Sequence, residues 1–188
     1  MGDSKRMAHQ QDHTARINEL DLLLRPDDGG AFDQIALVSD GRVAYAAWYS
    51  HLLSSLTLAS AGEDLAFGHA EVIEERGIAR IVVLTTSLVL TADLDLPAAD
   101  VSNPFVSVVP RSVIESFKVR AGQGVDVEGS RKLAWPQSLV IFVKYRGLDE
   151  PLELRGAALE QNDPARVGPI WKLLGELRAD ITGSSPGA

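Results

Sequence analysis

The run from Arg80 to Asp95 constrains the fold more than any other part of the chain. It reads RIVVLT, breaks at Thr86-Ser87, and continues as LVLTADLD, in which every second residue is leucine or alanine. A period of two is the pattern of a strand that buries one side and exposes the other to water. Two such runs joined by a short polar break are typical of a hairpin. The sequence therefore predicts an antiparallel sheet with a well-specified register around this hairpin.

Five further segments have strand character and are separated by glycine, proline or polar clusters. They are Leu65 to Glu75, Phe105 to Val109, Ser112 to Val119, Leu139 to Tyr145 and Pro151 to Arg155. Together with the hairpin they make about seven strands.

One amphipathic helix follows the strands. Asn162 or Asp163 is predicted to cap it, Pro164 is its predicted first residue, and Pro169 is expected to kink or delay it. Its apolar stripe consists of Ile170, Leu173, Leu174, Leu177 and Ile181. Short strands followed by such a helix suggest an α+β fold that is mainly β: a seven-stranded, strongly bent sheet or partly open barrel, capped by the C-terminal helix.

Residues 14–60 are expected to form a mainly helical N-terminal extension. A short helix is predicted from Thr14, and Pro26 follows its end. Between residues 32 and 59, Asp40-Gly41 favours a hairpin whereas leucines and alanines favour a helix, and both alternatives remain open. The extension is too apolar for an unattached arm, so it should dock on the barrel or on a second copy. Residues 1–13 and 183–188 are expected to be disordered, which leaves 61–182 as the barrel domain.

Three phrases in the chain follow the order of a known family. They are AGEDLAFGHAEV (Ala61 to Val72), GIARIVVLTTSLVLTAD (Gly77 to Asp93) and VSVVPRSVIESFKV (Val106 to Val119), and a helix carrying Trp171 comes after them. In this order the chain resembles the pleckstrin-homology-like domains of bacteria, which are related to GRAM domains, over about residues 61–181. The resemblance implies a barrel that works by presenting its edges and loops to a partner.

The turn between the first two strands departs from the lipid-binding members of that family. In those members the turn is basic and clamps phosphates, which requires cations that converge without nearby acids. Here Glu74-Glu75 lies beside Arg76 and Arg80. Phosphoinositide or membrane binding is therefore doubtful, and no lipid-binding residue is carried over.

Charge is distributed unevenly along the chain. The net charge of −8 disfavours nucleic acid as a partner. The segment from Arg111 to Arg146 nevertheless holds seven basic residues against three acids. The chain has no cysteine and no signal-like or membrane-spanning apolar stretch, so the cytoplasm is the expected compartment.

Residues that could carry chemistry are scattered. His9 and His13 have a zinc-like spacing, but they lie in the polar segment 1–13. His51 and His69 have no nucleophile motif near them, and no phosphate-binding glycine loop occurs. We therefore expect no catalytic residue, no metal site and no cofactor.

The predicted function is that of a non-enzymatic binding or scaffolding module that engages a protein partner or itself. The alternative is a small enzyme or ligand carrier with a polar site between the extension and the barrel, built around Tyr49 and His51. A concave pocket with converging polar groups favours the alternative, and an exposed apolar patch favours the module.

The long connection after Arg120 is the predicted partner-binding site. It places Arg131 and Lys132 beside Leu133 and Trp135. Loops of this length are uncommon in compact domains, and Trp and Arg are enriched among binding hot spots. Trp135 could instead fold back and close the end of the barrel.

Overall fold

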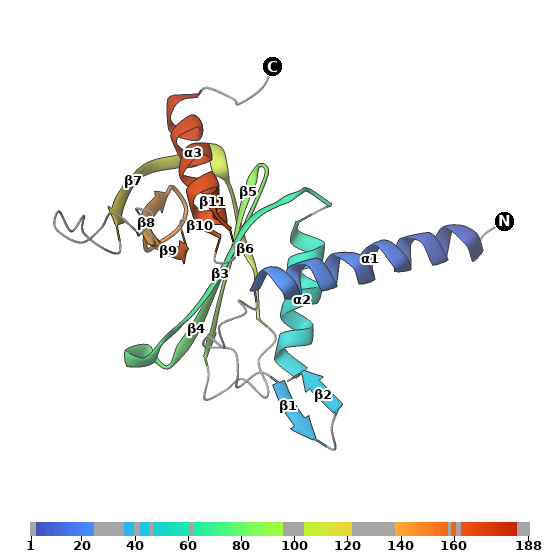
Figure 1. The fold of residues 1–188 in the computed structure, drawn as a ribbon. Helices are drawn as coiled ribbons and strands as arrows, with labels where there is room; N and C mark the ends of the chain where they lie inside the picture. Colours follow the sequence, from blue (N-terminus) through green and yellow to red (C-terminus); the bar gives the residue numbers. More distant parts are fainter. Residues whose placement is uncertain are drawn as a thin grey trace. The chain divides into compact units, whose positions relative to one another are not determined.

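The structure is a computed structural model (Figure 1) that describes residues 3–24, 36–39, 42–45, 47–60, 62–95, 104–121, 138–157, 159–160 and 163–183. The chain divides into two compact units, Met1–Val108 and Val109–Ala188.

The first unit begins with two helices and a small hairpin. Helix α1 spans Asp3–Leu24, strands β1 (Ala36–Ser39) and β2 (Arg42–Tyr45) pair antiparallel, and helix α2 spans Ala47–Ala59. Of the two structures left open for residues 32–59, both therefore occur, one after the other. Helix α1 starts within the segment 1–13 for which the sequence predicted disorder.

A four-stranded sheet follows, and its last strand runs past Val108, where the first unit ends. Its strands are β3 (Leu65–Ile73), β4 (Ile78–Thr85), β5 (Leu88–Asp95) and β6 (Ser107–Pro110), paired in that order. A single 3-10 turn, η1 (Glu74–Arg76), joins β3 to β4, and Gly77 follows it with a φ of 62°. The predicted hairpin at residues 80–95 is confirmed, with Ile81 opposite Ala92 and Val83 opposite Leu90. The predicted water-exposed face is wrong near the turn, where Val82, Leu84 and Val89 on the other face are buried as well.

The helices of the first unit pack on this sheet through one apolar core. Leu20 and Leu24 from α1 and Leu52 and Leu56 from α2 are buried together with residues of β4 and β5, among them Ile81. A buried leucine contributes about 1.5–3 kcal/mol relative to an exposed one. The apolar side chains of the extension therefore stabilise the fold, as their number led us to expect.

The second unit contains a three-stranded sheet. After the 3-10 turn η3 (Arg111–Val113) come β7 (Ile114–Ala121), β8 (Ser138–Tyr145) and β9 (Leu152–Ala157), antiparallel and adjacent in that order. A second small hairpin pairs β10 (Leu159–Glu160) with β11 (Asp163–Val167).

Helix α3 (Pro169–Thr182) ends the second unit, and its start corrects a prediction. The sequence placed the first helical residue at Pro164, but residues Asp163–Val167 form β11. Gly168 has an extended backbone, with φ −72° and ψ 168°, and Pro169 occupies the first turn. Proline disfavours a helical conformation in the residue before it and has no N–H for the preceding turn, so the helix cannot run through from Pro164.

The apolar stripe of α3 is confirmed for four of its five members. Ile170, Leu173, Leu174 and Leu177 are buried, whereas Ile181 is 45% exposed. Gly183 then ends the helix with a φ of 65°, in the left-handed region that glycine adopts without strain.

The architecture is thus α+β, with antiparallel sheets of four and three strands and, in the described ranges, three α-helices. All seven predicted strands occur. Their pairing divides them between two sheets, and within the described residues these ladders do not close into one barrel. Among the helices that the structure describes, none has the length and hydropathy needed to cross a membrane.

Candidate interaction surface on the three-stranded sheet

The alternating burial of side chains along β8 distinguishes the two faces of the three-stranded sheet. Leu139, Ile141, Val143 and Tyr145 alternate along the strand and are buried. On this inner face, Ile170 of α3 lies so close to Gly156 of β9 that an added Cβ would meet it at 3.1 Å. The alternate residues of β8 point to the other side, which is called the outer face below.

The register of the strands places cations and apolar groups in rows on the outer face. Lys118 of β7 lies opposite Phe142 of β8, which lies opposite Glu153 of β9. In the next row, Arg120 lies opposite Val140, which lies opposite Arg155. Ser116 faces Lys144. The outer face is thus a mixed surface of basic side chains around two half-buried apolar ones.

Some of these charges are already paired. The Nζ of Lys144 lies 3.1 Å and the Nε of Arg146 3.7 Å from Glu115, so two cations share one carboxylate. Arg155 pairs with Glu153 at 2.7 Å. The three cations are mostly exposed and the two carboxylates partly so, and ion pairs at the surface stabilise proteins by only about 0–1 kcal/mol.

Two cations on β7 are left over. Within the described residues, neither Lys118 nor Arg120 has a carboxylate partner. The guanidinium carbon of Arg120 lies 5.6 Å from the centroid of the Phe142 ring, within range of a cation–π contact. Lys118 and Arg120 are exposed, so their positive charge is available to an external group.

Strand β7 is an edge strand. It pairs with β8 on one side and, in the part of the chain that the structure describes, with no strand on the other. Its regular part runs from Ser116 to Ala121, after an irregularity at its start. Lys118, Val119 and Arg120 are exposed in succession, so both faces of the strand are accessible at this point.

The basic segment noted in the sequence serves two purposes in the structure. Arg111, its first cation, is only 4% exposed and donates to Asp180 Oδ2 at 2.7 and 3.0 Å and to Glu176 Oε2 at 3.0 Å. Burial lowers the pKa of Arg111, but its hydrogen bonds to Asp180 and Glu176 outweigh this and hold the pKa above the ordinary value. Arg111 thus holds α3 in place, whereas Lys118 and Arg120 are not engaged in this way.

Tyr145 lies buried near this ion pair. Among the described residues its hydroxyl has no hydrogen-bond partner. Burial raises the pKa of Tyr145 well above the usual range, and the charge of Asp180 acts in the same direction while Arg111 opposes it. The hydroxyl therefore stays protonated and acts as part of the interior.

The predicted contact residues Arg131, Lys132, Leu133 and Trp135 lie outside the described residues. Their segment connects β7, which carries Lys118 and Arg120, to β8, which carries Lys144. Sequence reasoning missed Lys118, Arg120 and Phe142. The signal that could have found them is the alternation in SLVIFVKY together with the lysine and arginine two residues apart in FKVRA.

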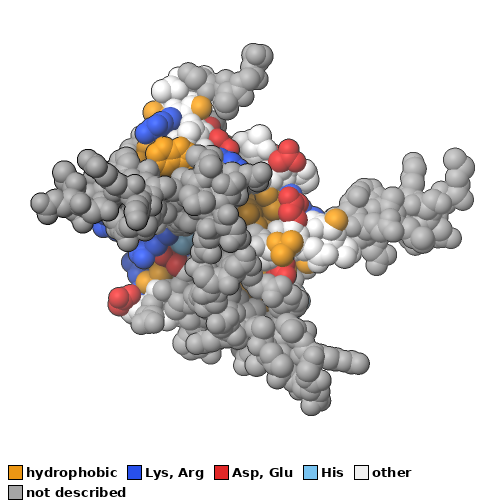
Figure 2. All heavy atoms as spheres, in the orientation of Figure 1, with side chains coloured by type: hydrophobic (Ala, Val, Ile, Leu, Met, Phe, Trp, Pro, Cys, Tyr) orange, Lys and Arg blue, Asp and Glu red, His pale blue; other side chains and the backbone are white. Residues whose placement is uncertain are grey.

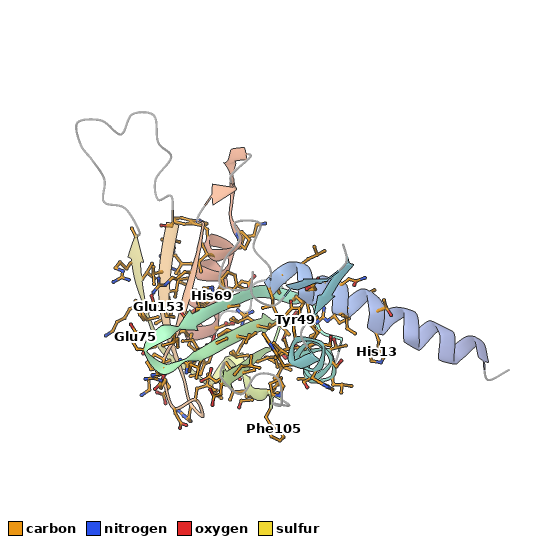
Figure 3. The ribbon with its side chains drawn as sticks, turned by 90° about the horizontal axis from the view of Figure 1, so that it is seen from below. His13, Tyr49, His69, Glu75, Phe105 and Glu153 are labelled. Carbon is orange, nitrogen blue, oxygen red and sulfur yellow. The ribbon has the colours of Figure 1, made fainter. Side chains whose placement is uncertain are left out.

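The residues of the alternative function do not form one polar site. Tyr49 is fully buried and donates to Asp21 Oδ1 at 2.8 Å, whereas His51 is exposed on the same helix (Tyr49 is labelled in Figure 3). Residues two apart on a helix do not face each other. Helix α1 includes His9 and His13, of which His13 is exposed, and the described residues contain no group of three potential metal ligands.

Arg80, on β4 shortly after the turn that follows β3, has its charge paired. Arg80 donates from Nε and Nη2 to the two carboxylate oxygens of Asp93, at 2.8 and 2.7 Å, across the β4–β5 pair. His69, farther back on β3, has its Nε2 at 3.9 Å from Glu71 (Figure 3). Because Nε and Nη2 of Arg80 both donate to Asp93, this guanidinium is poorly placed to bind a phosphate.

Comparison with known proteins gave no match: neither a family model, nor a curated protein, nor a solved structure is similar to the chain. The resemblance to pleckstrin-homology-like domains therefore stays a prediction from the order of the elements.

Proposed function

We propose that the chain is a non-enzymatic binding module that engages a protein partner or a second copy of itself. The observation that carries the proposal is the pair Lys118 and Arg120, two exposed cations on an edge strand without a carboxylate partner in the described ranges. Arginine beside an aromatic ring is a favoured composition at interfaces. Because neither cation has a carboxylate partner within the described fold, an external anionic group is the simplest use for both.

Two further parts of the proposal concern the fold and its setting. The order of the strands and of α3 supports a partly open barrel of the pleckstrin-homology-like kind. The cytoplasm is the proposed compartment, as the cysteine-free composition led us to expect. The Arg80–Asp93 pair speaks against a phosphate clamp at the turn where such domains bind lipids. No nucleic acid, cofactor or metal is part of the proposed function.

We place the connection that contains Arg131, Lys132, Leu133 and Trp135 in the same proposed surface, because it follows directly on β7, which carries Lys118 and Arg120. Replacing Trp135→Ala should weaken partner binding by at least about 2 kcal/mol, the scale of a hot spot, with the melting temperature nearly unchanged. A melting temperature lowered by several degrees with binding intact would identify Trp135 as a core residue instead.

The main experiment compares two charge reversals in the full chain. K118E/R120E reverses the outer-face cations, and K172E/R178E reverses two exposed cations of α3 and changes the net charge equally. Each protein is used to capture partners from its source cells, with quantitative mass spectrometry, and is also examined by sedimentation velocity. A binding module predicts that a captured protein or the self-association is lost in K118E/R120E and kept in K172E/R178E.

Equal capture and equal sedimentation by the two variants would contradict the proposal. Melting curves serve as the check on folding, because both pairs of side chains are exposed and should leave stability within about 1 kcal/mol of the wild type.

A further inference from the structure

The side chains of β7 alternate in chemistry as well as in direction. Lys118 and Arg120 lie on the outer face, whereas Phe117, Val119 and Ala121 lie on the inner face, opposite the buried Val143, Ile141 and Leu139. Val119 is nevertheless 43% exposed. The edge of β7 therefore offers cations on one side and uncovered apolar surface on the other.

An edge strand also offers unpaired backbone groups. N–H and C=O groups that face away from the sheet can pair with an added strand. Basic side chains on such an edge repel a strand of the same charge and attract an acidic one. The charges of these side chains thus select which strands can pair with the backbone of β7.

The strand that complements this edge can be specified. Residues directly opposite each other on paired strands have Cβ atoms about 5 Å apart. A strand paired with Ser116–Ala121 would therefore place its residues opposite Lys118 and Arg120 on the outer face, two positions apart, and the residue between them beside Val119. Acidic residues suit the outer positions and an apolar residue suits the inner one.

We propose that β7 binds an extended protein segment in which acidic and apolar residues alternate, and that the segment adds to the sheet as a further strand. The inference rests on the proposed function and names the chemistry of the partner. Single-stranded nucleic acid is a weaker fit, because the chain carries a net charge of −8 and the described outer face offers one aromatic ring for stacking.

The chain itself contains a short segment with the same alternation. Val125-Asp126-Val127-Glu128 follows β7 in the sequence and lies outside the described residues. The test must separate an external strand from this one, so it includes the variant D126S/E128S.

The probe is the fluorescein-labelled peptide Glu-Val-Glu-Val-Glu-Val-Glu, titrated with the full chain and followed by anisotropy. Three control probes are used: the same residues in block order, the alternating peptide with N-methylated backbone amides, and an oligothymidylate. Strand addition predicts that the alternating peptide binds and that the block and N-methylated peptides bind at least about tenfold more weakly, because they cannot form the ladder in register.

The variants give the second half of the test. K118E/R120E should weaken binding of the alternating peptide by about tenfold or more, and K172E/R178E should leave it within about twofold. K118Q/R120Q, which removes charge without reversing it, should lie between these two. Added salt should weaken the wild-type interaction.

Four results would overturn the inference. Equal binding of the N-methylated peptide excludes strand addition but leaves the proposed function standing, since capture of a partner is measured separately. Binding of the oligothymidylate without the peptide shows a nucleic-acid surface. Peptide binding only in D126S/E128S shows that the chain's own segment takes the edge. No binding by any protein shows that the cations merely protect the edge from other strands.

Discussion

The edge strands β3 and β7 use their side chains in opposite ways. In β3 none of the described side chains is exposed, and Gly68 lies so close to α1 that an added Cβ would meet Leu23 Cγ at 2.5 Å. In β7 five of the eight side chains are exposed, including Lys118 and Arg120. Figure 2 shows hydrophobic side chains on the visible surface beside the C-terminal part of α1.

The difference lies in what the residues are needed for. Side chains of β3 are constrained by a neighbouring helix, and a change there alters the fold. The outer side chains of β7 touch little, and a change there should alter binding alone. In the second unit, α3 is held by Arg111 of η3, which donates hydrogen bonds to Asp180 and Glu176 of that helix.

The largest effect is expected at Arg111. Replacing Arg111→Ala leaves Asp180 and Glu176 without their buried cation and should destabilise the second unit by about 3 kcal/mol. R111K should recover only part of this, because an ammonium cannot reproduce the forked contacts of a guanidinium. Chemical denaturation of the full chain measures both.

The matched control for Arg111 is the double variant K118A/R120A. Because these side chains are exposed and have no carboxylate partner in the described ranges, their loss should change stability by less than about 1 kcal/mol. A larger loss would show that the outer face of β7 stabilises the fold, and the contrast with β3 would fail.

Gly68→Ala tests the other edge strand. The new Cβ would meet Leu23 Cγ at 2.5 Å and Cδ2 at 2.8 Å, and the backbone oxygen of Leu23 at 3.2 Å. Overpacking of this kind should cost about 2 kcal/mol. V119A on β7 is the counterpart and should cost less than about 1 kcal/mol, since Val119 is 43% exposed. Equal losses in the two variants would remove the contrast.

Replacing Tyr145→Phe should stabilise the protein, unlike the substitutions above. A buried hydroxyl without a hydrogen-bond partner is costly, so its removal should stabilise the protein by about 1 kcal/mol. The raised pKa of Tyr145 makes the free energy of unfolding depend on pH. The contribution from keeping the hydroxyl protonated is complete below the unfolded pKa of about 10 and is lost as the pH rises above it. The variant should lack this alkaline loss. A variant less stable than the wild type would show that the hydroxyl has a partner.

The smallest effect is expected at Glu63 in the first unit. Its carboxylate accepts hydrogen bonds from Ser87 and Thr85 at 2.6 Å each, and the hydrogen bonds of Ser87 and then Thr85 hold the pKa of Glu63 below its ordinary value. A lowered pKa gives stability that is present above the unfolded pKa and is lost as the pH falls through the folded one. E63Q should therefore melt below the wild type at neutral pH, and the two melting temperatures should converge in acid. A gap that stays constant with pH would mean that ionisation of Glu63 is not linked to folding.

Periodicity predicted the strands well because the signal is local. The alternation of Leu90, Ala92 and Leu94 gives both the hairpin and its buried face. The stripe from Ile170 to Leu177 similarly gives the buried side of α3. The start of α3 was misplaced because two prolines compete for the first turn, and only the one followed directly by the stripe begins the helix.

The candidate surface depends on long-range contacts and was not predictable in this way. Seven cations between Arg111 and Arg146 look equivalent in the sequence. Only the fold shows that Arg111 is buried against Asp180, 69 positions away, and that Lys144 has Glu115 as a neighbour. The division of the strands between two sheets likewise follows from pairing, which no local pattern encodes.

Hydrogen exchange of the full chain, with and without the peptide Glu-Val-Glu-Val-Glu-Val-Glu, tests the central claim most directly. Strand addition engages backbone amides, so the peptide should slow exchange in Ile114–Ala121. Exchange in Leu65–Ile73, the edge strand that lies against α1, should stay unchanged. Protection confined to β7 and absent in K118E/R120E is the predicted result. Unchanged exchange in β7 at saturating peptide, or equal protection of β3, would contradict the assignment of this edge as the binding surface.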